Sequence, residues 1–331
     1  MEAMTERTGT KAEGVAPVDL EDVRAARRRI GDRVHRTPLF SATLLGRRAG
    51  VDLHLKCENL QKTGSFKPRG VLNRVLDLGE EERGRGVVTV SAGNHAQALA
   101  WGARSAGVDA VVVMPETAPT AKVEASRGYG AEVVLHGTVF DAFDRAMELS
   151  NREGYVFVHP FDQPEIVAGQ GTVGLEIVED LPELDAVVVP VGGGGLLGGI
   201  AVAVREQRPD VRVLGVEPEG ADSMRRSLDA GEPVHLDEVD TIADGLGSPM
   251  AGDLTFPLAR RHVDDVVLVS DDEIATAVGE LLTWTKLLAE PAGAAAVAAL
   301  LTGRLPLADD ARVAAVISGG NVDLAALKEM I

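Results

Sequence analysis

An alternation of valine-rich runs with helix-like stretches constrains this chain more than any other feature. The runs are continuously apolar instead of alternating apolar with polar residues, which is typical of strands covered on both faces. The stretches between them have helical spacing, so the pattern predicts βαβ units with a parallel sheet. The predicted strands are Leu53–Lys56, Val87–Val90, Ala110–Met114, Glu132–Leu135, Val156–Val158, Ala186–Pro190, Val211–Val216, Asp265–Val269 and Val313–Ile317. The predicted helices include Leu20–Ile30, Phe140–Ser150, Pro164–Leu181, Leu196–Gln207 and Asp272–Leu288.

The spacing of these units predicts two domains, which the length of 331 residues also fits. Four compact βα units between Val87 and His159 can form a small sheet of their own. We therefore expect a small domain over residues 86–159, inserted into a large domain of residues 19–85 and 160–331. A ligand site is expected between the two. Residues 1–18 have no periodicity and are expected to form a flexible arm.

Composition excludes several classes of protein. A formal net charge of −18 argues against nucleic acid or an anionic membrane as a partner, because both repel an acidic surface. The single cysteine, Cys57, excludes a disulfide framework and a zinc cluster built on cysteines. No apolar run approaches the roughly 20 residues of a membrane helix, and no signal-peptide core is present. We therefore expect a cytoplasmic protein.

Lys67 lies in the segment GSFKPRG, residues 64–70, directly before a helical run. Pro68 suits the first position of a helix, because its missing N–H is not needed there. The positive end of a helix disfavours a second positive charge, so the Lys67 ammonium should lose its proton readily. Such a lysine can form a Schiff base with an aldehyde and then act as a base. A lysine seen in isolation is more often an ordinary surface residue, and other motifs must decide between the two.

A second motif has the composition of an anion-binding turn. Ser91, Ala92, Gly93, Asn94 and His95 follow a predicted strand and precede a helical run over Ala96–Ala106. Backbone N–H groups at such a helix start can bind a carboxylate or a phosphate. The amide of Asn94 can also hold a phenolic or carbonyl oxygen. The alternative is an ordinary helix cap.

Four consecutive glycines, Gly192, Gly193, Gly194 and Gly195, follow the predicted strand 186–190 and precede Leu196. Glycines let the backbone wrap closely around a phosphate at a helix start. Residues 193–198 also satisfy the G-x-G-x-x-G pattern, and Glu217 ends the next strand, where a dinucleotide fold places its ribose-binding acid. A nicotinamide dehydrogenase is therefore a rival interpretation. It leaves Lys67 and the turn 91–95 without a task.

The last predicted strand ends in Ser318-Gly319-Gly320-Asn321. A serine hydroxyl at the carboxyl end of a parallel strand points into the ligand crevice. There Ser318 can bond a ring nitrogen without carrying charge. Alternatively, it caps a helix over Val322–Met330.

Together these motifs resemble the threonine dehydratase and serine racemase family of pyridoxal-phosphate enzymes. The similarity runs from about Arg36 to Asp323, and the motifs occur in the family's order at residues 56–70, 91–97, 169–172, 192–195, 290–293 and 318–321. It implies an α/β, two-domain fold of type II, similar to the tryptophan synthase β subunit, with parallel-rich sheets covered by helices.

The resemblance also implies a role for each motif around pyridoxal 5'-phosphate. Lys67 would carry the cofactor as a Schiff base, and Phe66 would pack beside its ring. Asn94 would bond the phenolic oxygen, and Ser318 would face the pyridine nitrogen. The remaining implied contacts are Gly192, Gly193, Gly194, Gly195 and Leu196 with the phosphate, Gly245 near the ring, and Ser91, Ala92, Gly93, Asn94 and His95 with the substrate carboxylate.

The implied activity is that of an ammonia-lyase (dehydratase) acting on L-threonine or L-serine by β-elimination, giving a 2-oxo acid and ammonia. Lys67 would remove the α-proton, and a neutral Ser318 favours prompt elimination over a long-lived carbanion. Family racemases carry a serine where this chain has Ala92, which has no proton to exchange, so racemisation is disfavoured. A dehydratase of another β-hydroxy amino acid, such as 3-hydroxyaspartate or phenylserine, and a silent ligand-binding protein are further alternatives.

The family's cation site resembles the stretch from Glu217 to Ser223. Glu217 and the Ala221 carbonyl would bind a monovalent or divalent cation, but Ser223 stands where an acid would complete the site. Asp222, next to Ser223, could compensate for the missing acid. The partner implied by the resemblance is a small-molecule β-hydroxy amino acid, and we expect a homodimer.

Overall fold

The computed structural model describes residues 17–330 of the chain. The strands are β1 Leu39–Ser41, β2 Asp52–Cys57, β3 Val87–Val90, β4 Ala110–Met114, β5 Glu132–Leu135, β6 Val156–Phe157, β7 Ala186–Pro190, β8 Arg212–Pro218, β9 Asp265–Val269 and β10 Arg312–Ile317. The helices are α1 Leu20–Ile30, α2 Thr43–Ala49, α3 Lys67–Leu76, α4 Glu80–Arg85, α5 Asn94–Ala106, α6 Thr120–Tyr129, α7 Val139–Glu153, α8 Pro164–Asp180, α9 Gly195–Arg205, α10 Ser223–Ala230, α11 Thr255–His262, α12 Asp271–Thr285, α13 Pro291–Leu301 and α14 Leu324–Met330.

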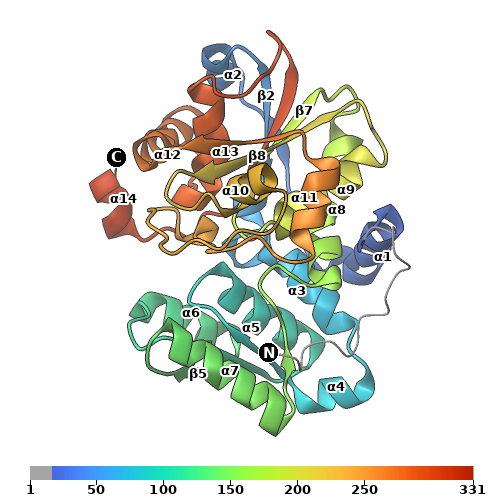
Figure 1. Ribbon diagram of the computed structural model, residues 1–331, viewed down its shortest axis with the longest axis vertical. Helices are drawn as coiled ribbons and strands as arrows, with labels where there is room; N and C mark the ends of the chain where they lie inside the picture. Colours follow the sequence, from blue (N-terminus) through green and yellow to red (C-terminus); the bar gives the residue numbers. More distant parts are fainter. Residues whose placement is uncertain (1–16, 331) are drawn as a thin grey trace.

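The strands form two sheets, which lie at opposite ends of the molecule (Figure 1). The larger sheet has the strand order β1-β2-β10-β7-β8-β9, and the smaller has the order β5-β4-β3-β6. Neighbouring strands run parallel throughout, except that β1 pairs antiparallel with β2 at the edge of the larger sheet. The predicted α/β class with parallel-rich sheets is confirmed.

Alternate residues of the central strands pack into different cores, which explains their continuous apolar sequences. In β7, Ala186 and Val188 belong to the cluster around the alanine-rich helix α13. Val187 and Val189 point to the other face and pack with α8 and α9. A strand whose two faces are both covered by helices must be apolar at every position.

The smaller sheet is covered in the same way. Val87 and Val112 pack with α5 on one face, and Val88 and Val111 pack with α7 on the other. Helix α3 lies between the two sheets and contacts both α8 and α5, so it joins the two halves (Figure 1). The smaller sheet falls within the predicted segment 86–159, and the division into domains stays a prediction.

Two details differ from the expectations. Strand β1 was not predicted, because three residues at a sheet edge carry too little periodicity. Val18 is fully buried with Val23 and Ala26, so packed structure begins before residue 19, while residues 1–16 of the predicted arm lie outside the described residues. Over residues 17–330, no helix is long and apolar enough to cross a membrane.

Candidate active site

A cavity of about 1620 Å³ brings together all the residues predicted to bind a cofactor or substrate. Its lining includes Phe66 and Lys67, the turn 91–95, the segment 192–196 and Ser318. The parallel strands explain this convergence, since Ser91, Gly192 and Ser318 each follow the carboxyl end of a strand. Ligands of open α/β sheets bind at these ends.

Lys67 is the first residue of α3, and its side chain reaches into the cavity. The Nζ atom donates to the carbonyl of Pro160 at 2.8 Å and lies 5.1 Å from the centre of the Phe66 ring. Burial lowers the pKa of the Lys67 amine to about 8, against an opposing effect of the negative charge of Glu290. The pKa shift therefore has the expected direction, and its main cause is removal of the amine from water.

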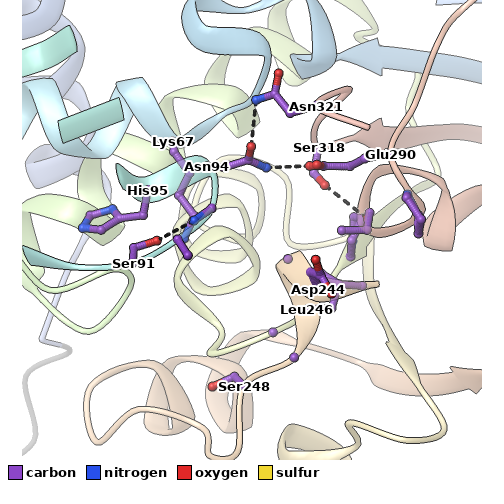
Figure 2. Close-up of a pocket in the computed structure, with 18 of the residues that line it drawn as sticks. Lys67, Ser91, Asn94, His95, Asp244, Leu246, Ser248, Glu290, Ser318 and Asn321 are labelled. Carbon is purple, nitrogen blue, oxygen red and sulfur yellow. Dashed lines mark hydrogen bonds between the residues drawn. The ribbon is translucent and has the colours of Figure 1, made fainter. Parts of the chain in front are cut away.

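Asn94 is held by hydrogen bonds at both ends of its amide (Figure 2). Its Oδ1 accepts from Nδ2 of Asn321 at 2.8 Å, and its Nδ2 donates to Oε1 of Glu290 at 2.6 Å. The Asn321 amide also donates to the carbonyl of Thr63, which fixes its own orientation. Asn94 lines the cavity, and one N–H of its amide takes no part in these two bonds.

Glu290 is a residue to which the sequence assigned no role, although its motif at 290–293 was noted. Burial raises the pKa of its carboxyl to about 7, while the hydrogen bond from Asn94 and the positive charge of Lys122 act in the opposite direction. A buried, titratable group beside Asn94 and Lys67 is common in active sites. Glu290 directly precedes α13, and the packing of α13 against β10 brings it to the cavity.

The turn at 91–95 lines the cavity, and one of its side chains is buried against a neighbouring backbone carbonyl. The Ser91 hydroxyl accepts from the Gly93 N–H at 3.1 Å. The His95 ring is buried against the carbonyl of Val158, with Nε2 at 3.1 Å from that oxygen, and points away from Asn94 (Figure 2). Burial, aided by the charge of Lys67, lowers the pKa of His95 to about 3. The His95 ring is therefore neutral at physiological pH.

In the glycine turn between β7 and α9, neighbouring atoms leave no space for a side chain. A Cβ atom on Gly193 would lie 2.4 Å from the Phe161 ring, and Gly194 has a φ of +90°, which L residues rarely adopt. Because α9 begins at Gly195, its first N–H groups have no acceptor within the helix. A positive helix end with free N–H groups is suited to a phosphate.

Ser318 does not cap a helix, because α14 begins only at Leu324. Its buried hydroxyl donates to the carbonyl of Ala292 at 3.3 Å, at the wall of the cavity. The helix-cap alternative for Ser318 is therefore wrong. The hydroxyl is neutral and close to α13, as a partner for an uncharged ring nitrogen would be.

Glu217 does not line the cavity, and neither does Ala221. The Glu217 carboxylate accepts from the backbone N–H groups of Met224 and Arg225, at 2.9 and 2.8 Å, and so caps α10. Burial raises the pKa of Glu217 to about 8. Across residues 17–330, no group of three His, Cys, Asp or Glu side chains is placed to hold a metal. The predicted cation site gains no support, and Glu217 is not available to a ribose.

An amine that is readily neutral, facing a glycine-lined anion site at the ends of parallel strands, is typical of α/β enzymes that hold a phosphorylated carbonyl compound. Residues 30–319 match the sequence model of the family described as "Pyridoxal-phosphate dependent enzyme". This chain belongs to that family, which also overturns the rival dinucleotide interpretation.

Several characterised proteins are similar to this chain over most of its length. It is 47% identical to an L-threonine ammonia-lyase of Thermotoga maritima over 95% of this chain and 78% of that protein. It is 43% identical to a catabolic L-threonine dehydratase of Escherichia coli K12 over 95% of this chain and 96% of that protein. The structure of maize serine racemase superimposes with a TM-score of 0.91 at 38% identity, covering 94% of this chain and 96% of that one. The predicted fold type II is confirmed.

Proposed function

We propose that this chain is a pyridoxal-phosphate-dependent ammonia-lyase that converts L-threonine, and L-serine, into a 2-oxo acid and ammonia. The observation that carries the proposal is the position of Lys67. Its amine, with a pKa lowered to about 8, shares one cavity with the glycine turn and with the turn 91–95. The similarity to threonine ammonia-lyases supports the choice of substrate.

The residues of the cavity fit the cofactor that the family uses. The Lys67 amine would hold it covalently with Phe66 beside the ring, the N–H groups from Gly192 to Leu196 would hold its phosphate, and Asn94 and Ser318 would bond its phenolic oxygen and ring nitrogen. When bound, pyridoxal phosphate supplies an electron sink that acidifies the α-hydrogen of an amino acid. The narrow space beside Phe161 and the left-handed Gly194 support a phosphate at this turn.

The chain's own residues would then bind the substrate and move its proton. The backbone of the turn 91–95 would hold the substrate carboxylate at the start of α5. The Lys67 amine, neutral once free, would accept the α-proton at Nζ. The pKa values of His95 and His159, lowered to about 3 and about 4 mainly by burial, leave both rings uncharged and remove them as competing acids.

Charges around the cavity favour a substrate with a neutral side chain. The cationic residues of its lining are Lys67 and Lys122, and Lys122 is paired with Asp244 at 3.2 Å. The lining carries further carboxylates, at Asp271, Asp272, Asp323 and Glu329. A second carboxylate, as in 3-hydroxyaspartate, would meet repulsion here and no free cation.

The experiment that tests this function is an absorbance spectrum of the purified protein followed by an assay for 2-oxo acid. We expect a yellow protein that releases 2-oxobutyrate from L-threonine and pyruvate from L-serine, with far less turnover of 3-hydroxyaspartate. A yellow protein that turns over 3-hydroxyaspartate or phenylserine better would contradict the choice of substrate. A colourless protein that pyridoxal phosphate cannot reconstitute would contradict the proposal as a whole.

Changing Ala92 to serine is expected to add a racemisation activity. Ala92 lines the cavity and lacks an exchangeable proton, so the unmodified chain should form almost no D-serine from L-serine. The Ala92→Ser variant should produce D-serine at a measurable rate by chiral chromatography, because a hydroxyl there can return a proton to the substrate. Ala125→Ser, the same change elsewhere in the lining, is the matched control. Racemisation by the unmodified chain, or an equal gain in the control, would contradict the prediction.

The rate at which the cofactor-free chain takes up pyridoxal phosphate is expected to depend on the protonation of Lys67. Only the neutral amine attacks an aldehyde, and the pKa of Lys67 is lowered to about 8. The second-order rate constant should therefore rise with pH and level off above about pH 8. A rate that keeps rising beyond roughly pH 10, as for an ordinary lysine, would show that the amine is not buried as described.

Further features stay proposals supported by the family resemblance and the sequence. These are a homodimer, a cytoplasmic location, a cation at Glu217 and Ala221, and the absence of nucleic-acid and membrane partners.

A further inference from the structure

A hydroxyl outside the cavity makes a hydrogen bond to the glycine turn. Thr255 is the first residue of α11 and is fully buried, and it is not among the residues that line the cavity. We propose that Thr255 is a positioning residue that fixes the Gly193–Gly194 peptide and thereby sets the affinity for a phosphate at the turn. This inference rests on the proposed function and deepens it.

The Thr255 hydroxyl has two carbonyl acceptors at very different distances. Its Oγ1 lies 2.6 Å from the carbonyl oxygen of Gly193 and 3.4 Å from that of Gly252, and it accepts from the N–H of Gly252 at 2.9 Å. A hydroxyl has one hydrogen, and the much shorter distance assigns it to Gly193. In a planar trans peptide, the carbonyl and the following N–H point in opposite directions. The Gly194 N–H is therefore directed away from Thr255.

Thr255 is itself anchored by a half-buried carboxylate. Oδ1 of Asp162 accepts from the backbone N–H groups of Leu254 and Thr255, at 3.0 and 3.2 Å. Asp162 follows Phe161, whose ring packs on Gly193, and Pro160, whose carbonyl accepts from Lys67. The segment 160–162 thus connects α11, the glycine turn and the lysine. A movement of α11 would therefore shift the Gly193 carbonyl.

The glycine turn needs such support because its residues have little conformational preference of their own. Glycine accepts both positive and negative φ, so without a tether the peptide after Gly193 can rotate and present its carbonyl to the anion. The hydrogen bond from Thr255 removes this rotational freedom when the chain folds. Binding of the phosphate then loses less conformational entropy, which is the usual benefit of a preorganised site. The proposal therefore concerns binding of the phosphate group and not the chemistry at Lys67.

The test compares two probes that differ only in the phosphate. Dissociation constants of the cofactor-free chain for pyridoxal phosphate and for pyridoxal are measured by absorbance for the unmodified chain, Thr255→Val and Thr255→Ser. We expect Thr255→Val to weaken binding of pyridoxal phosphate about 10-fold, the scale of one buried hydrogen bond. Binding of pyridoxal should change by less than about 2-fold, and Thr255→Ser should restore both values, because it keeps the hydroxyl.

Controls separate the tether from a general loss of structure. Thr89→Val removes another fully buried hydroxyl, which donates to the carbonyl of Val158 at 2.8 Å, and should leave both constants unchanged. If Thr255→Val does not fold, Thr255→Ala removes the same hydroxyl without adding a methyl group to the core. An unchanged affinity for pyridoxal phosphate, or an equal loss for both probes, would overturn the inference. Failure of the unmodified chain to bind pyridoxal phosphate would instead overturn the proposed function.

Discussion

Changing Lys67 to alanine is expected to remove both the yellow colour of the bound cofactor and the turnover of L-threonine. The structure places this amine at the start of α3, where it lines the cavity, and it is also the proposed acceptor of the α-proton. Loss of a general base alone costs roughly 10²–10⁴-fold in rate, and loss of the covalent attachment adds to this. We therefore expect a fall in kcat of at least about 10³-fold.

Two companion variants make this prediction specific. Lys67→Arg keeps a positive charge but cannot be deprotonated, so it should be as inactive as Lys67→Ala. Lys62→Ala removes a lysine five positions earlier that does not line the cavity, and it should keep its colour and its activity. The readouts are the absorbance spectrum and the release of 2-oxobutyrate. Substantial turnover by Lys67→Ala would refute the assigned role of this amine.

Changing Arg69 to alanine is expected to cost more stability than a substitution at the surface. Arg69 is fully buried two residues after Lys67 and donates to two carboxylates. Its Nε and a terminal nitrogen bond Glu58, each at 2.8 Å, and its terminal nitrogens bond Glu176 at 2.7 and 2.9 Å. Lys56, also fully buried, donates to Glu176 at 2.6 Å. The four side chains join β2, α3 and α8.

Removing Arg69 takes from Glu58 its cationic partner and leaves Glu176 with Lys56. Breaking a buried ion pair in this way costs about 3–5 kcal/mol, because the remaining charge is desolvated and unpaired. We expect the free energy of unfolding in urea to fall by this amount. Arg152→Ala, which removes an exposed arginine paired with Glu148, should change it by about 1 kcal/mol or less. Similar losses for the two variants would show that the buried network contributes little.

Local sequence was sufficient for the valine-rich strands and for the helix starts that follow them. The valine runs at 87–90, 110–114 and 186–190 are strands in the structure with the predicted bounds, because a strand buried on both faces is apolar at each position whatever its partners are. The glycine turn and the start of α3 are equally local, since a helix start depends on a few adjacent residues. These short-range signals placed Lys67, Gly193 and Ser318 at the ends of the right elements.

Contacts between distant segments decided the rest. The bond from Asn94 to Glu290 joins residues 196 positions apart, and the bond from Arg69 to Glu176 joins residues 107 apart. Neither pair has a signal in the sequence around it, because the pairing depends on the order of the strands in the sheets and on the helices that cover them. The lowered pKa of Lys67 also depends on distant segments, because its main cause is burial by residues from several elements. Chain neighbours specify which element forms, whereas tertiary packing specifies which polar groups lose water and which partners they then find.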